Sequence, residues 1–207
     1  MIEVREATLE DISNVVDIHL EAFPRFFLSS LGSGFLKLYY KSILAYKDGV
    51  LLVAKKNNEV IGFAAGSVLS FRFYYQIIRG NFVKYTIRGV GLLLTKPQKL
   101  LHVFKNMTKV SSNYNDTGLY SELISIGVNP NVQRSGAGRS LLRKFEEIIA
   151  SKGGKIVSLT TDYYNNDKAL SFYESLGYSV WYDFITYPDR RMFRMQKTLD
   201  NQDFVCK

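Results

Sequence analysis

The chain has 207 residues, of which 46% are hydrophobic and 22% are charged, a composition typical of a folded globular protein and not of a disordered one. Its length favours one domain with an insertion over two separate domains, because domains average about 150 residues. No apolar stretch reaches the roughly 18 residues that cross a bilayer, and the N-terminal sequence carries acids where a signal peptide carries bases. The single cysteine, Cys206, excludes a disulfide framework and a cysteine-rich metal site. We therefore expect one cytoplasmic domain over residues 1–207.

The net charge of +8 is concentrated in one segment. Residues 70–118 contain eight Lys or Arg residues and one acid, Asp116, so the rest of the chain is almost neutral. A segment with this charge is expected to contact an anionic substrate, a phosphate-rich partner or a lipid surface.

Residues 1–69 predict strands and helices in turn. Alternating or β-branched residues indicate strands, and apolar residues three or four apart indicate helices. The predicted elements are a strand over 2–5, helices over 12–23 and 35–46, and strands over 50–55 and 60–68. Thr8-Leu-Glu-Asp11 is a capping signal for the first helix. Asn57-Asn58 predicts an antiparallel hairpin between the last two strands.

Residues 70–118 interrupt this pattern with a predicted helical insertion. Apolar residues, mostly aromatic, recur at three- and four-residue steps over 71–85 with basic residues between them, so we expect an amphipathic helix with an aromatic and a basic face. The residues of the aromatic face are Phe71, Tyr74, Tyr75, Ile78, Phe82 and Tyr85. A second helix is predicted from Pro97, and a polar loop over 111–116.

The remaining residues return to alternating strands and helices. Strands are predicted over 123–128, 156–159, 178–186 and 192–198, and helices over 138–152 and 166–176. Helices interleaved among strands in this order predict a mixed α/β domain.

A glycine-rich turn lies between the predicted strand 123–128 and the predicted helix 138–152. Its sequence is Val128-Asn-Pro-Asn-Val-Gln-Arg-Ser-Gly-Ala-Gly138. Free backbone amides at a helix N-terminus, with glycines that let oxygen atoms approach, suit a phosphate group. A tight connection without a ligand is the alternative. The turn is neither a dinucleotide fingerprint nor a nucleoside triphosphate loop, because Leu141 stands where the third glycine belongs and no Gly-Lys-Ser/Thr follows.

Two motifs resemble those of the GCN5-related N-acetyltransferase (GNAT) superfamily. Gln133-Arg-Ser-Gly-Ala-Gly138 matches the family signature Gln/Arg-x-x-Gly-x-Gly/Ala, and Asn166-Asp-Lys-Ala-Leu-Ser-Phe-Tyr-Glu-Ser-Leu-Gly-Tyr178 matches its Asn-x-x-Ala-x-x-x-Tyr-x-x-x-Gly-Phe/Tyr element. One helix and one strand separate the motifs, as in the family, and only residues 70–118 depart from its order of elements. The resemblance implies a mixed, mostly antiparallel sheet with a splayed central strand pair and flanking helices. It also implies acetyl-CoA as the acyl donor and an amine as the acceptor.

The resemblance implies where the donor binds. The amides of residues 134–139 would hold the pyrophosphate of coenzyme A, and the exposed backbone of Ser125–Val128 would pair with its pantetheine arm as an extra strand. The residues expected to bind the donor are Ile126, Gly127, Val128, Gln133, Arg134, Ser135, Gly136, Ala137, Gly138, Arg139, Asn166 and Phe172. Asn166 would bind the pantetheine or order the loop before its helix, and a simple helix N-cap is the alternative.

Glu122 and Tyr173 are the predicted catalytic side chains. An alkylammonium has a pKa near ~10.4 and must lose a proton before it attacks a thioester. Glu122 stands where histone-type members of the family have their base, so its removal is expected to lower the rate at neutral pH and less at high pH; a solvated glutamate without a role is the alternative. The resemblance implies that Tyr173 protonates the departing thiolate, directly or through a water. A core tyrosine on an amphipathic helix is the alternative.

Two further expectations concern the backbone and the histidines. Gly127 in the middle of a strand predicts a bulge or a close approach, which would splay this strand from its neighbour and open a slot for the donor. A backbone amide near Gly127 or Val128 would meet the developing oxyanion. His19 and His102 are expected to be structural, because neither metal-ligand spacing nor a catalytic-triad pattern surrounds them.

Residues 24–46 and 70–118 are expected to select the acceptor. Aromatic rings can stack on a sugar or a base, and Arg and Lys can neutralise a diphosphate. The leading expectation is therefore N-acetylation of a small amine such as a nucleotide- or phosphate-linked amino sugar. A protein or peptide amine, and a non-catalytic module that binds polyanions or a membrane through 70–118, are the alternatives. The aromatic residues could also only pack this segment onto the domain. Neither a metal ion nor a nucleic acid is an expected partner.

Overall fold

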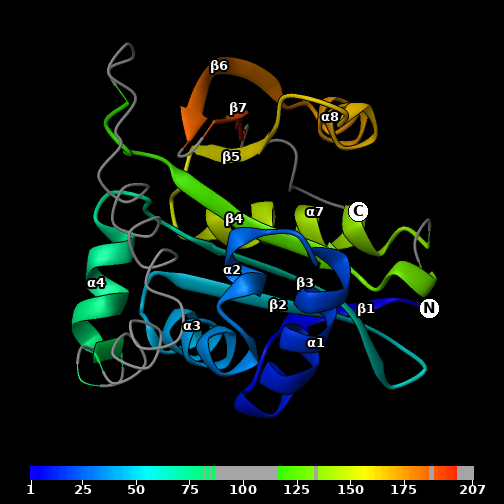
Figure 1. The fold of residues 1–207 in the computed structure, drawn as a ribbon. Coiled ribbons are helices and arrows are strands. Elements are labelled where there is room, and N and C mark those ends of the chain that lie inside the picture. The colour runs from blue at the N-terminus through cyan, green and yellow to red at the C-terminus, as the bar shows by residue number, and fades with distance from the viewer. Residues whose placement is uncertain (82, 84, 87–115, 133–134, 187–188, 200–207) are drawn as a thin grey trace.

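The computed structural model describes residues 1–81, 83, 85–86, 116–132, 135–186 and 189–199. A seven-stranded sheet in the order β1-β2-β3-β4-β5-β7-β6 forms its centre (Figure 1). The strands are β1 (Glu3–Glu6), β2 (Gly49–Lys56), β3 (Glu59–Ser67), β4 (Ser121–Val128), β5 (Ile156–Asp162), β6 (Ser179–Thr186) and β7 (Arg190–Thr198). Only β4 and β5 pair in parallel, and the other neighbours are antiparallel. This arrangement confirms the mixed, mostly antiparallel sheet predicted from the sequence.

Helices cover both faces of strands β2 to β4 (Figure 1). The helices α1 (Ile12–Ala22) and α3 (Ser33–Ala45) pack on one face, and α7 (Ala137–Ser151) packs on the other. The other helical elements are η1 (Leu9–Asp11), α2 (Phe27–Ser30), α4 (Phe73–Gly80), η2 (Pro130–Val132) and α8 (Asp167–Glu174). Each face of the sheet carries its own cluster of buried apolar residues. Within the described parts of the chain, no helix is long and apolar enough to cross a membrane.

Local sequence signals determine several of these element boundaries. The backbone amide of Thr8 donates a hydrogen bond of 2.8 Å to the Asp11 carboxylate, as the predicted capping signal requires. Asn57 and Asn58 have φ angles of 51° and 69°, the left-handed conformation of a two-residue hairpin turn. Gly153, just after α7, has a φ of 82°, which favours glycine at the end of a helix. The predicted first helix, hairpin and helix 138–152 are therefore confirmed.

The insertion begins with α4, whose buried face differs from the predicted one. Phe73 and Ile77 are buried, whereas Phe71 and Tyr75 are 47% and 57% exposed. The prediction was wrong because the helix starts only after Arg72, which has a left-handed φ of 59°, so Phe71 lies before its first turn. The predicted helix from Pro97 and most of the polar loop that follows it lie outside the described residues.

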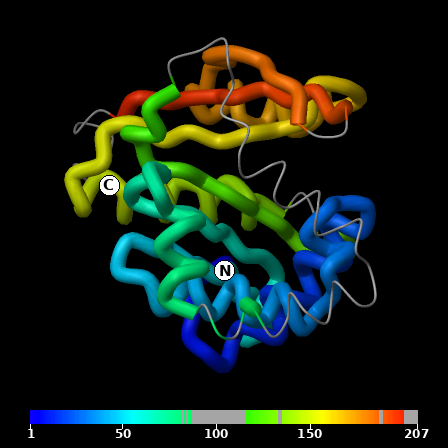
Figure 2. Tube along the Cα trace, turned by 60° about the vertical axis from the view of Figure 1, so that its left-hand side comes forward, coloured from blue at the N-terminus to red at the C-terminus, as the bar shows by residue number. Residues whose placement is uncertain are grey.

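The sheet opens between β4 and β5, as Figure 2 shows from a second direction. These strands pair only from Ser121–Leu123 to Val157–Leu159, although β4 continues to Val128 and β5 to Asp162. Beyond Leu123, β4 stays paired with β3 and β5 stays paired with β7. The two halves of the sheet therefore diverge, as expected of a splayed central strand pair.

The irregularity in β4 lies at Ile124 and not at Gly127. Ala65 pairs with Ser125 and Gly66 with Leu123, so Ile124 is the extra residue of a β-bulge, which bends a strand and increases its twist. Gly127 pairs regularly with Phe63. A Cβ atom at Gly127 would lie 2.9 Å from the Phe63 ring. The predicted close approach at Gly127 is thus present, whereas the bulge belongs to Ile124.

Candidate active site

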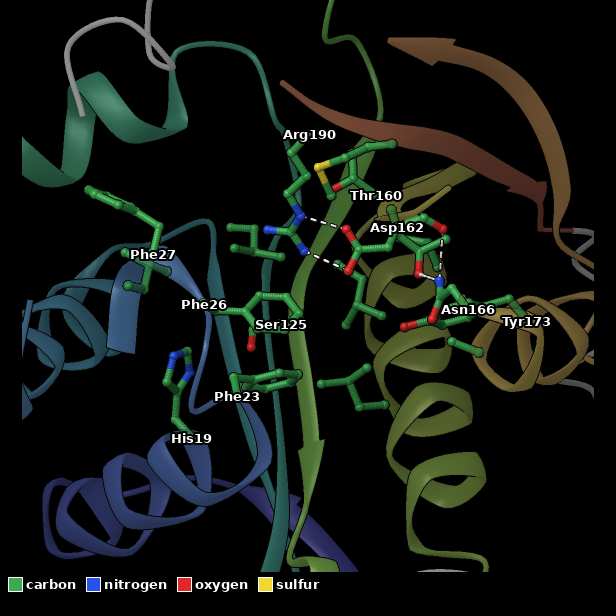
Figure 3. Close-up of a pocket in the computed structure, with 18 residues that line it drawn as sticks. His19, Phe23, Phe26, Phe27, Ser125, Thr160, Asp162, Asn166, Tyr173 and Arg190 are labelled. Carbon is green, nitrogen blue, oxygen red and sulfur yellow. Dashed lines mark hydrogen bonds and ion pairs between the residues drawn. The ribbon is translucent and has the colours of Figure 1, made fainter. Parts of the chain in front are cut away.

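A pocket of about 370 Å³ lies where β4 and β5 diverge (Figure 3). Residues 123–126 of β4 and 159–162 of β5 line its base. The side chains of the surrounding walls are His19, Phe23, Phe26, Phe27, Leu28, Asn166, Ala169, Tyr173, Arg190 and Met192. The volume lies in the range of small-ligand sites. One wall comes from α1, α2 and the loop between them, and the opposite wall from α8, so the pocket lies between the two halves of the sheet.

Tyr173 lines this pocket from α8. Its side chain is almost buried, with 9% exposed, and burial raises the pKa of its phenol to about 12. Its ring packs against the rings of Phe172 and Tyr178, with centroid distances of 5.2 and 5.9 Å. Tyr173 is therefore both a core residue and a protonated phenol in the pocket at neutral pH.

The glycine-rich turn leads from β4 into α7. Gly136 takes a left-handed φ of 87° at the N-cap of the helix. Main-chain pairing inside α7 begins with the Ser140 amide, which donates to the Gly136 carbonyl, so the preceding amides are available to a ligand. The Ser135 hydroxyl is buried and has no hydrogen-bond partner among the described residues. Free amides beside an unpaired buried hydroxyl fit the oxygen atoms of a pyrophosphate. Gln133 and Arg134 lie outside the described residues.

Replacement of Gly138 tests this turn. A Cβ atom at Gly138 would lie 3.6 Å from the Phe172 ring, an ordinary contact, so Gly138→Ala should bind coenzyme A nearly as well as the wild type. Gly138→Leu should raise the Kd for coenzyme A at least about tenfold, because its side chain obstructs charge-assisted hydrogen bonds worth roughly 1.5–3 kcal/mol. Isothermal titration calorimetry measures both. Wild-type affinity in a folded Gly138→Leu protein would contradict a pyrophosphate site at this turn.

Asn166, Arg139 and Phe172 hold α8 in place. The Asn166 amide donates to the Thr161 hydroxyl at 2.6 Å and to the Asp162 carbonyl at 2.9 Å. Asn166 stands at the N-cap of α8, as one alternative predicted, and its carbonyl accepts hydrogen bonds from the Ala169 and Leu170 amides. Its side chain makes no capping hydrogen bond and orders the loop before the helix instead, which agrees with the other alternative. Arg139 donates to the Ser175 hydroxyl at the end of α8. Phe172 lies next to Gly138.

The predicted donor residues of β4 lie on different sides of the strand. Ile126 lines the pocket. Gly127 lies against the rings of Phe63 and Phe23, and Val128 packs on the apolar cluster beneath α7. Because Ile124–Val128 have no strand partner in β5, the backbone along this edge of β4 can pair with an extended ligand.

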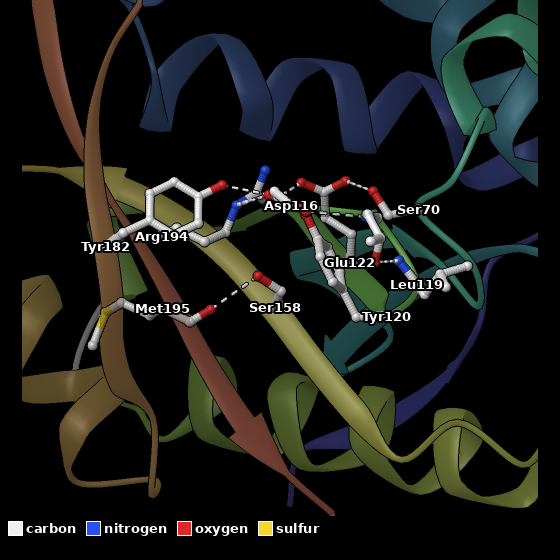
Figure 4. A network of polar contacts seen from close by, with 11 residues as sticks. Ser70, Asp116, Leu119, Tyr120, Glu122, Ser158, Tyr182, Arg194 and Met195 are labelled. Carbon is white, nitrogen blue, oxygen red and sulfur yellow. Dashed lines mark hydrogen bonds and ion pairs between the residues drawn. The ribbon is translucent and has the colours of Figure 1, made fainter. Parts of the chain in front are cut away.

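Glu122 is buried in a polar network beside β7 (Figure 4). One oxygen accepts a 2.6 Å hydrogen bond from Arg194, and the other accepts a 2.5 Å bond from the Ser70 hydroxyl. Asp116 accepts hydrogen bonds from the hydroxyls of Tyr120 and Tyr182 and lies 3.8 Å from the Arg194 guanidinium. The alternative of a solvated, idle Glu122 is therefore wrong.

The network has two consequences. Ser70 and Asp116 lie at the two ends of the insertion, so Glu122 and Arg194 attach both ends to the central sheet. Glu122 itself is absent from the described lining of the pocket, and both of its oxygens have protein partners. Its role as the base stays a prediction, and the contacts favour a positioning role.

His19 is a pocket residue that no sequence motif predicted. It lies on α1 with 3% of its surface exposed, and burial lowers its pKa to about 4. Its position among Val15, Val16 and Phe23 on the inward face of the helix was visible in the sequence, but no pattern showed that this face reaches a pocket. Asp162 and Arg190 were missed as well. They form two hydrogen bonds of 2.5 and 2.8 Å between β5 and β7.

The wall formed by α1 and α2 carries aromatic rings. Phe23, Phe26 and Phe27 line the pocket there, and the Arg190 guanidinium lies 4.4 Å from the Phe26 ring centroid. These phenylalanines border or belong to the segment 24–46 that was expected to select the acceptor. The described side chains of α4 do not line the pocket, so the part of the insertion described by the structure lies elsewhere.

The fold and the pocket together define a class of protein. A mixed sheet that opens at one parallel strand pair, a glycine-rich turn that starts a helix at the end of the first strand, and a buried phenol in the opening are features of acyltransferases that use acyl-coenzyme A. A sequence model of the acetyltransferase (GNAT) family matches residues 13–178. The chain belongs to this family.

Comparison with individual proteins agrees with the family assignment. The chain is 35% identical over 80 residues to the mycothiol acetyltransferase of Kocuria rhizophila, a match that covers 39% of this chain but only 26% of that protein. Its fold is similar to that of yncA from Salmonella typhimurium, solved with acetyl-CoA (TM-score 0.62, 15% identity, 97% of this chain and 95% of that chain). It is also similar to the PaiA N-acetyltransferase of Thermoplasma acidophilum, solved with coenzyme A (TM-score 0.53, 16% identity, 96% and 99%).

These findings confirm the predicted family and fold. The family is one of acetyltransferases, as predicted, and the two similar structures were solved with acetyl-CoA, the predicted donor, and with coenzyme A. The acceptor and the roles of individual residues are not tested by them.

Proposed function

We propose that the protein transfers the acetyl group of acetyl-CoA to the primary amine of a small acceptor, and that this acceptor is a nucleotide- or phosphate-linked amino sugar. The observation that carries the proposal is the pocket between β4 and β5. It joins an unpaired strand edge and a protonated phenol to a wall of aromatic rings.

The donor half of the pocket supports acetyl-CoA binding. The unpaired edge of β4 offers hydrogen bonds to the amide groups of pantetheine, and the turn at Ser135–Arg139 offers them to the pyrophosphate. A free main-chain amide near Gly127 or Val128 would stabilise the oxyanion that forms when the amine attacks, a contribution worth about 3 kcal/mol. Tyr173 would then deliver a proton to the departing sulfur.

The acceptor half supports a small acceptor with a flat or ring-shaped body. The rings of Phe23, Phe26 and Phe27 offer apolar surface on which a sugar can pack. The eight Lys and Arg residues of 70–118 supply the positive potential that attracts a phosphorylated compound.

A panel of amines tests the proposal through the release of free thiol from acetyl-CoA. The panel contains glucosamine, glucosamine 6-phosphate, a nucleoside diphosphate-linked amino sugar, spermidine and a peptide with a free N-terminus. We expect thiol release with the phosphorylated sugars, at a higher kcat/KM than with unphosphorylated glucosamine.

Two other outcomes would change the proposal, one in its acceptor and the other in its catalytic activity. Turnover with the peptide alone would replace the acceptor class and retain the transferase. Failure of acetyl-CoA to raise the Tm, together with salt-sensitive binding of an oligonucleotide or of anionic vesicles, would favour the non-catalytic alternative.

A further inference from the structure

A buried histidine, His19, lies in the wall of the pocket. The side chain of His19 rises from α1 toward the pocket beside Phe23, opposite Ser125 of β4 (Figure 3). Its Nδ1 lies 2.6 Å from the hydroxyl of Tyr40 on α3. Its Nε2 is buried and has no hydrogen-bond partner among the described residues. Because burial of a polar atom without a hydrogen-bond partner is unfavourable, this nitrogen is expected to bind a hydrogen-bond donor of a ligand.

The His19 ring is packed against other aromatic rings and is uncharged. Its centroid lies 5.1 Å from that of Phe23 and 6.1 Å from that of Phe63. Tyr40 is the titratable group beside it from α3, and it is completely buried. Burial alone accounts for the lowered pKa of His19, so the imidazole is neutral at the pH of an assay and keeps a lone pair. Ser125 of β4 also lines the pocket.

We propose that His19 is a catalytic residue, and that its Nε2 accepts a hydrogen bond and then a proton from the attacking amine of the acceptor. In the tautomer that we assign, Nδ1–H donates to the Tyr40 oxygen, which leaves the Nε2 lone pair directed at the pocket. The inference rests on the proposed function, because it requires an amine in the half of the pocket formed by α1 and α2.

The step is balanced with the residues at hand. The amine reacts in its neutral form, after its ammonium form has given a proton to solvent. Its nitrogen bonds to the acyl carbon, and the bond between carbon and sulfur breaks. One proton leaves the nitrogen for His19 Nε2, and one reaches the sulfur from Tyr173. The positive charge that develops on the attacking nitrogen makes its proton more acidic than in the free amine, so a weak base suffices at this stage. Solvent then takes the proton from His19 and gives one back to Tyr173, which restores both side chains to their starting states.

Nitrogen NMR of the full chain tests the geometry independently of the acceptor. The probe is S-(N-butylcarbamoylmethyl)-coenzyme A, which places an amide N–H near the position of the acceptor nitrogen, and coenzyme A is the reference ligand. In protein labelled with ¹⁵N-histidine, the His19 signals are those lost in His19→Gln. We expect Nε2 to be unprotonated in the free protein and to shift with the probe but not with coenzyme A. A protonated Nε2, or equal shifts with both ligands, would overturn the proposal.

Steady-state kinetics with glucosamine 6-phosphate and with n-butylamine test the chemistry. His19→Gln should lower kcat about 100-fold and change the KM for acetyl-CoA less than about twofold. Added imidazole should restore part of the rate of His19→Ala. Ser67→Ala is the matched control, because Ser67 is also buried with an unpartnered hydroxyl but does not line the pocket; its kcat should equal that of the wild type.

Two outcomes separate this inference from the proposed function. A folded His19→Gln protein with a kcat within twofold of the wild type would overturn the inference and leave the function intact. A wild-type protein that acetylates neither amine would count against the proposed acceptor, and the NMR comparison would then decide the role of His19 alone.

Discussion

Tyr173→Phe should lower kcat about 100- to 1000-fold at neutral pH while the Kd for acetyl-CoA changes less than about twofold. The substitution removes the proton donor for the departing thiolate, and general acid catalysis is typically worth factors of this size. The ring remains packed against Phe172 and Tyr178, so the Tm should stay close to that of the wild type. Thiol release under saturating donor and acceptor measures kcat.

The raised pKa of the phenol has a defined consequence for the pH profile. Burial holds the pKa of Tyr173 at about 12, so the phenol stays protonated, and able to donate, up to about pH 11. The same desolvation also raises the pKa of the leaving thiol of coenzyme A. The pKa values of the Tyr173 phenol and of the thiol therefore stay closer together than the raised pKa of the phenol alone would suggest. Ionisation of Tyr173 should therefore not lower the wild-type rate below pH 11. The pH–rate profile of the wild type should contain no fall below pH 11 that is missing from the profile of Tyr173→Phe.

Tyr178→Phe is the matched control for this prediction. Tyr178 is also a buried tyrosine next to α8, and its hydroxyl donates a 2.9 Å hydrogen bond to Glu146, away from the pocket. Its removal should lower the Tm, because Glu146 loses a partner, and should leave kcat unchanged. A kcat within about threefold of the wild type in Tyr173→Phe would refute the role of the phenol.

Loss of either member of the Glu122–Arg194 pair should destabilise the fold by about 3–5 kcal/mol. Each side chain is almost buried, with 10% and 13% exposed, and removal of one leaves an incompletely compensated buried charge. Glu122→Leu and Arg194→Met should therefore each lower the free energy of unfolding by this amount in urea denaturation. The double variant should recover part of the loss, because two apolar side chains of similar volume can replace a buried ion pair, although Asp116 then lacks the guanidinium that lies 3.8 Å away in the wild type.

The double variant also separates the two roles considered for Glu122. If Glu122 only positions the ends of the insertion, the stable double variant should retain kcat within a few-fold, with no new dependence on pH. If Glu122 is the base, the double variant should be slow at neutral pH and less slow at high pH. Single variants as stable as the wild type would show that the network adds nothing to the fold.

The elements that the sequence predicted correctly are those encoded by local patterns. The helix α7 and the β2–β3 hairpin follow from residues close in the chain: an apolar stripe at three- and four-residue steps, and two residues that tolerate positive φ. The same holds for the glycine-rich turn and for the motif that carries Tyr173. The predicted aromatic face of α4 was wrong because the helix starts where the backbone conformation of Arg72 allows it, and the spacing of apolar residues does not reveal that conformation.

The residues that line the pocket could not be predicted from local patterns. His19 reaches it only because α1 packs across β3 and β4, and Asp162 meets Arg190 only through the register between β5 and β7. Arg194 lies 72 residues from Glu122 in the chain. Such pairs depend on which strands become neighbours, a choice that alternating polarity within one strand leaves open.

The sequence by itself determined the order of the elements, the turn at the start of α7 and the family to which the chain belongs, because each of these is encoded by residues within one turn, one strand or one helix. Only the tertiary structure decided where the sheet opens and which side chains surround the opening. It also decided that Glu122 is paired, whereas one His19 nitrogen has no partner in the part of the chain that the structure describes. These features arise when segments far apart in the chain bury their surfaces against one another, and burial and pairing are properties of the packed molecule that no single segment possesses.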